Sequence, residues 1–90
     1  MLYPNGEQIA LGDVVSVEMP EGPARARVVM LGQSREHLEM DSESLEWYSG
    51  EGLDPGDIVV EWYDGDVPRP GAYMSTEVKC CIELIARSAS

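Results

Sequence analysis

Apolar and polar residues alternate along several short blocks of this chain, which is the pattern of β-strands. In residues 13–19, Val15, Val17 and Met19 alternate with polar residues, so this block predicts a strand with one face in the core and one in water. Residues 24–31 begin with the same alternation and become apolar on both faces over their last four positions. The sequence therefore predicts two strands, the second of which enters the interior as it runs.

Three further strands are predicted in the second half of the chain, at residues 57–63, 72–76 and 79–86. Clusters of Gly, Pro and Asp separate the strands, and the rigid stretch 68–71 is expected to turn the chain between two of them. Trp62 alternates with apolar neighbours and is expected to face the core. Five strands are enough to close a barrel.

One helix is predicted between the second and third of these strands. Asp41 is suited to cap its N-terminus, and Gly50 and Gly52 are suited to end it. The helix would have only about two turns and would need to pack on the sheet to persist. A short strand over residues 37–40 is an alternative for the segment just before it.

These elements predict a mainly β fold of one domain spanning residues 1–90. The expected architecture is a small SH3-like barrel or a strongly bent antiparallel sheet of about five strands. The one short helix lies between the second and third main strands. A chain of 90 residues has a thin core at this size.

The charge of the chain is strongly negative. Seventeen Asp and Glu stand against six Lys and Arg, which gives a formal net charge of -11. Such a field repels phosphate backbones and anionic lipids, so neither nucleic-acid binding nor membrane binding is expected. No apolar stretch approaches the 18 residues of a membrane span, the first residues lack the order of a signal peptide, and Cys80 and Cys81 stand side by side in an apolar run. These features favour a cytoplasmic protein.

Candidate catalytic and metal sites are sparse. His37 is the only histidine, and adjacent cysteines in a strand point to opposite faces, so no zinc site is expected. Asp54, Asp57, Asp64 and Asp66 do not have the spacing of an EF-hand calcium loop and are better explained as turn residues. No nucleophile or phosphate-binding motif is present, so we expect neither a cofactor nor an enzyme, and a pair of carboxylates is the one catalytic alternative left.

The most informative segment is residues 36–66, which contains eleven carboxylates and no Lys or Arg. One interpretation is a solvated face that keeps the protein soluble. The other is a docking surface for a basic protein, because aromatic residues of the kind that anchor interfaces lie in the same segment. The residues predicted to bind the partner are Glu36, Glu39, Asp41, Glu43, Glu46, Trp47, Tyr48, Tyr63, Asp64 and Asp66.

Two parts of the chain resemble known proteins. Residues 12–17, the turn at 20–23 and the return over 24–32 resemble the opening hairpin of SH3-like small barrels, over about a third of the chain. Residues 35–41, 45–47, 58–62 and 71–74 are similar to small acidic bacterial proteins of toxin–immunity loci. Immunity proteins cover the active site of a toxin, so this resemblance implies a protein partner and no catalytic residue.

The sequence thus leads to two main hypotheses. The first is an immunity-type inhibitor whose acidic face covers a basic surface of a partner toxin or enzyme. The second is a structural or adaptor module that assembles with itself or with a larger complex, in which case acidity serves only solubility.

Overall fold

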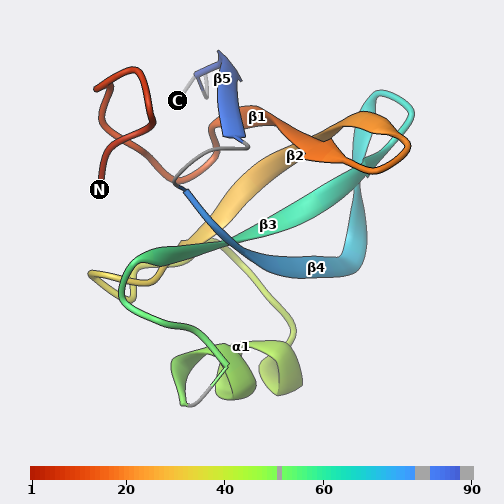
Figure 1. Cartoon of the computed structure of the whole chain (residues 1–90). Helices are drawn as coiled ribbons and strands as arrows, with labels where there is room; N and C mark the ends of the chain where they lie inside the picture. Colours follow the sequence, from red (N-terminus) through yellow and green to blue (C-terminus); the bar gives the residue numbers. More distant parts are fainter. Residues whose placement is uncertain (51, 79–81, 88–90) are drawn as a thin grey trace.

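Five antiparallel strands form one sheet in the computed structural model, which describes residues 1–50, 52–78 and 82–87. The strands are β1 (Val14–Met19), β2 (Gly22–Leu31), β3 (Asp57–Asp64), β4 (Val67–Glu77) and β5 (Ile82–Ala86), and their order in the sheet is β4-β3-β2-β1-β5. Helix α1 (Ser42–Ser49) lies between β2 and β3 in the chain and against one side of the sheet (Figure 1). The prediction of a mainly β fold is confirmed. Of the two architectures expected, the structure has the bent antiparallel sheet, and this sheet is not closed into a barrel.

The sheet bends because three of its strands carry irregularities. In β2 the pairing with β3 shifts by one residue at Val29, and in β5 the pairing with β1 shifts by one residue at Ile85. A larger bulge lies in β4, where the four residues 69–72 stand opposite the single residue Trp62 of β3. Bulges of this kind increase the local twist and curve a strand, and β4 turns sharply along its length in Figure 1.

The bulge in β4 corrects one prediction. Residues 68–71 do not turn the chain between strands, because Pro68 already pairs with Tyr63 and the segment belongs to β4. The turn lies earlier, at Gly65, which has a φ of 68°. Proline lacks an N–H and is tolerated on an edge strand, so β4 can contain two prolines at the outer edge of the sheet.

Apolar residues pack in two clusters on opposite faces of the sheet. The first cluster includes Val15, Val17 and Val60 and is joined by half-buried Trp62, as the alternation predicted. The second cluster consists of Val29, Met30, Leu53 and Val59, and α1 packs against it. The centre of β2 is therefore buried on both faces, as predicted from its continuous apolar run.

The segment before β1 completes the first cluster, which the sequence analysis did not predict. Tyr3 and Ile9 are buried there at 3% and 2% exposure. Asp13 is fully buried and accepts hydrogen bonds at Oδ2 from the Tyr3 hydroxyl (2.5 Å), the Ala10 N–H (3.0 Å) and Arg87 Nη1 (3.1 Å). Burial and the Asp13 carboxylate together raise the pKa of Tyr3, so its hydroxyl stays protonated and able to donate. This polar network joins the first twelve residues to the end of β5.

Gly32 follows β2 at a point where the chain passes very close to another backbone segment. A Cβ at this position would lie 2.2 Å from the Asp54 carbonyl oxygen and 2.5 Å from the Asp57 carbonyl oxygen. We expect Gly32→Ala to lower the free energy of unfolding by about 1–3 kcal/mol, because backbone must move to admit the methyl group. Chemical denaturation of this variant and of Gly56→Ala, which has open space around its Cα, would measure the difference. Equal stability of the two variants would contradict the packing described here.

The remaining expectations for the C-terminal region are met only in part. The last predicted strand is present over Ile82–Ala86, whereas the predictions for Cys80 and Cys81 concern positions outside the described residues. Among the residues that the structure describes, no helix has the length and apolar character needed to cross a membrane.

Candidate functional site

Helix α1 begins and ends where the sequence predicted. Asp41 caps it, with its Oδ2 accepting a hydrogen bond of 2.9 Å from the Ser44 N–H, and the Gly50 N–H donates back to the Glu46 carbonyl at the other end. The Ser44 N–H lowers the pKa of Asp41, so this carboxylate is ionised at neutral pH. The alternative of a strand at residues 37–40 is reduced to one isolated bridge, between His37 and Met30.

One side of α1 is attached to the sheet. Leu45 and Tyr48 pack against the second cluster, and burial raises the pKa of Tyr48. Arg35, in the loop after β2, donates from Nη1 to the Tyr48 carbonyl at 3.0 Å and so places a positive charge at the negative end of the helix. Arg35 and Tyr48 therefore hold the helix in place, and Tyr48 is turned toward the core.

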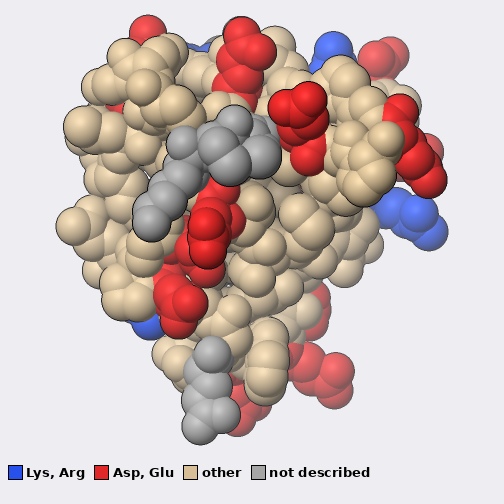
Figure 2. All heavy atoms as spheres, viewed as in Figure 1, with Lys and Arg blue, Asp and Glu red and all other residues tan. Residues whose placement is uncertain are grey.

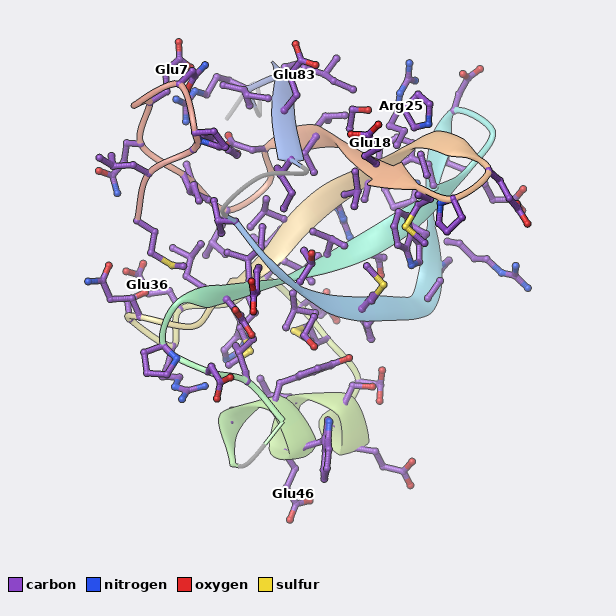
Figure 3. All side chains as sticks on the ribbon, viewed as in Figure 1. Glu7, Glu18, Arg25, Glu36, Glu46 and Glu83 are labelled. Atoms are coloured by element: carbon purple, nitrogen blue, oxygen red, sulfur yellow. The ribbon has the colours of Figure 1, made fainter. Side chains whose placement is uncertain are left out.

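The opposite side of α1 faces solvent and forms what we call the Trp47 face, made of Glu43, Glu46, Trp47 and Gly50. These residues are spaced three and four apart, so they lie on one side of the helix, and they line a surface groove of about 450 Å³. Trp47 is 60% exposed, and no residue of α1 is buried. Glu46 points away from the sheet (Figure 3). The result is an exposed indole between two carboxylates.

Gly52 holds the indole of Trp47 in position. A Cβ at residue 52 would lie 2.2 Å from Trp47 Nε1, and the Gly52 N–H donates to the Trp47 carbonyl at 3.0 Å. We expect Gly52→Ala to displace the indole, because a side chain can turn away at lower cost than backbone can move. In a ¹H–¹⁵N spectrum the indole N–H signal of Trp47 should shift while that of Trp62 stays in place. An unchanged Trp47 signal would contradict the contact.

A second groove lies beside the N-terminus of α1, and we call it the Tyr73 groove. It has a volume of about 640 Å³. Its floor contains Arg27 and Glu61, which pair across β2 and β3 through Arg27 Nε and Nη2, both on Glu61 Oε1 at 2.9 and 2.8 Å. Its lining residues are Arg27, Glu39, Met40, Asp41, Glu61, Pro68, Pro70, Gly71 and Tyr73.

The structure divides the predicted partner-binding residues into two groups. Asp64 and Asp66 lie at the turn between β3 and β4, at the other end of β3 from α1 (Figure 1). Tyr63 is half-buried there, with the Arg25 guanidinium 5.8 Å from its ring centre. The expected single face over residues 36–66 is therefore not continuous.

The other group is close to α1. Glu39, Asp41, Glu43, Glu46 and Trp47 lie on or directly before the helix, and Glu36 lies in the loop after β2, apart from Glu46 (Figure 3). Glu61, which the sequence analysis counted as part of an acidic surface, is only 3% exposed and is paired with Arg27. Over the rest of the visible surface, acidic side chains are widely distributed and basic side chains stand near the margins (Figure 2).

Two residues of the Tyr73 groove were missed as site residues, namely Arg27 and Glu61. Arg27 and Glu61 both occupy polar positions of predicted strands, but only the register of β2 against β3 brings them together. A comparison of the chain with protein-family models, with curated proteins and with solved structures found no match.

Proposed function

We propose that this protein is a non-catalytic binding module that docks the Trp47 face on a basic surface of another protein. The observation that carries the proposal is the 60% exposure of Trp47 on a helix that lies within a stretch of the sequence, residues 36–66, containing eleven carboxylates and no Lys or Arg. A large aromatic side chain held in water is unfavourable unless a partner covers it, and tryptophan is the residue type that most often anchors interfaces.

The charge of the protein indicates the kind of partner. A net charge of -11 attracts a positively charged protein over a distance and accelerates encounter, and the indole then contributes to holding the complex together. This combination suits an immunity-type inhibitor acting in the cytoplasm, which covers the basic cleft of a toxin or enzyme with carboxylates in place of phosphates. The proposal assigns no reaction to the protein itself.

A pull-down from an extract of the native host tests the proposal. The tagged protein and the double variant Glu43→Lys/Glu46→Lys would be washed at low and at high salt. We expect one dominant basic protein on the unmodified bait, lost at high salt and absent from the variant. The matched control is Glu18→Lys/Glu21→Lys, which makes the same change in charge at exposed positions on β1 and the following turn. Equal capture by both double variants would contradict docking through the Trp47 face.

A second candidate function is self-assembly through β5. This strand is one of the two edges of the sheet, and it carries Ile85 at 50% exposure, whereas the other edge, β4, contains two prolines. Sedimentation equilibrium of the free protein tests this alternative, because pairing of β5 with a second copy would give a stable oligomer at micromolar concentration. A monomer would leave the basic partner as the better explanation of the exposed surface.

A further inference from the structure

We infer that the Tyr73 groove receives an arginine side chain of the basic partner. This inference rests on the proposed function, and it names the side chain of the partner that one part of the docking surface would bind. It concerns the groove beside the N-terminus of α1 and not the Trp47 face, so the two can be tested separately.

The floor of the groove is fixed by an ion pair. Glu61 is 3% exposed, and Arg27 donates to its Oε1 from both Nε and Nη2. Because both of these donors are directed at Glu61, the positive charge of Arg27 is largely compensated within the protein. The Arg27–Glu61 pair is therefore close to neutral as a unit, and the groove takes its net charge from the carboxylates of its rim.

The rim adds two carboxylates, from Glu39 and Asp41, both of which are exposed. Together with Glu61 they make three negative groups against the one guanidinium of Arg27, which is a formal charge of about -2 over the lining residues. Asp41 is held in place by the helix that it caps, and the Ser44 N–H keeps its pKa low. The charge of the groove therefore favours a cation and disfavours an anion.

The walls favour a planar cation over a compact one. Tyr73 contributes its ring, and two prolines, Pro68 beside the β4 bulge and Pro70 within it, contribute flat apolar surfaces. Burial and then the charge of Glu61 raise the pKa of Tyr73, so its ring remains neutral. Guanidinium groups stack on aromatic rings and bind carboxylates through two parallel hydrogen bonds, whereas the ammonium group of lysine is a strongly hydrated point charge.

Titration of the ¹⁵N-labelled full chain with short peptides tests this inference at low ionic strength. The probes are acetyl-Gly-Arg-Gly-amide and the same peptide with lysine or neutral citrulline in place of arginine. We expect saturating shifts at Asp41, Glu61, Gly71 and Tyr73 with the arginine peptide, affinity about threefold weaker with lysine, and no saturating shifts with citrulline.

Two double variants supply matched changes in charge. Glu39→Gln/Asp41→Asn removes the rim charges while asparagine still caps the helix, and we expect it to weaken arginine-peptide binding about fivefold. Glu43→Gln/Glu46→Gln removes the same number of charges from the Trp47 face and should leave groove binding nearly unchanged.

The inference is overturned if shifts occur only on α1, if citrulline binds as well as arginine, or if no peptide shifts the groove residues. In each case a partner captured through the Trp47 face would leave the proposed function standing. Conversely, arginine binding in the groove with no partner captured by the bait would contradict the proposed function and support the groove as an arginine site.

Discussion

Replacement of Asp13 with alanine is expected to lower the free energy of unfolding by about 3 kcal/mol. Asp13 is fully buried, and its Oδ2 accepts from the Tyr3 hydroxyl, the Ala10 N–H and Arg87. Its removal leaves the buried Tyr3 hydroxyl and a backbone N–H without this acceptor, and such lost partners cost about 1–3 kcal/mol each. Arg87 is 44% exposed and can turn to water, which limits the total loss.

Chemical denaturation of Asp13→Ala, Asp13→Asn and Glu7→Gln would measure this effect. Glu7 is the matched control, because it pairs with the same Arg87 at 3.3 Å but is 53% exposed, so its replacement should cost less than about 1 kcal/mol. Asp13→Asn keeps the shape and removes the charge, and its stability should fall between the other two. A loss for Asp13→Ala no greater than that for Glu7→Gln would contradict the role of the network in joining the two ends of the fold.

Trp47→Ala is expected to weaken binding of the captured partner by at least about thirtyfold, the size of effect typical of an interface anchor. The same change should alter the stability of the free protein by less than about 0.5 kcal/mol, because the side chain is 60% exposed and α1 has no buried residue. Isothermal titration calorimetry with the partner and denaturation of the free variant would provide the two values.

Leu2→Ala is the control for Trp47→Ala. Leu2 is also a large exposed apolar residue, at 57%, but it belongs to the segment before β1, and the N-terminus of the chain lies away from α1 (Figure 1). Its replacement should leave affinity within about twofold of the unmodified protein. If Trp47→Ala bound the partner as tightly as Leu2→Ala does, the Trp47 face would not be the anchor of the complex.

Much of the fold could be predicted from the sequence, because local patterns determine it. Alternation placed β1 and β3, the continuous apolar run placed the doubly buried part of β2, and Asp41 with Gly50 bounded α1. The path of β4 could not be predicted, since two prolines normally indicate a turn and only pairing with β3 shows a bulge. Asp13 was also missed, because a carboxylate after glycine suggests a turn, while its partners Tyr3 and Arg87 are 10 and 74 residues away.

Only those residues of the candidate site that are close together in the sequence were correctly grouped by the prediction. Glu43, Glu46 and Trp47 lie together because one helix carries them, and helical spacing is visible in a sequence. Asp64 and Asp66 were grouped with them by charge. These two residues lie at the turn after β3, however, and the eight residues of β3 separate this turn from the end of the sheet near α1. Arg27 and Glu61 are 34 residues apart, and a sequence does not show the strand register that joins them.

The association rate of the protein with its captured partner, measured by stopped flow as a function of ionic strength, tests the central claim most directly. We predict that the rate constant falls at least about tenfold between roughly 20 mM and 500 mM salt, while dissociation changes much less, because steering between opposite charges is screened. In the Glu43→Lys/Glu46→Lys variant the rate should be lower and its dependence on salt weaker. A rate constant that is independent of salt, or unchanged in this variant, would contradict docking through the acidic Trp47 face.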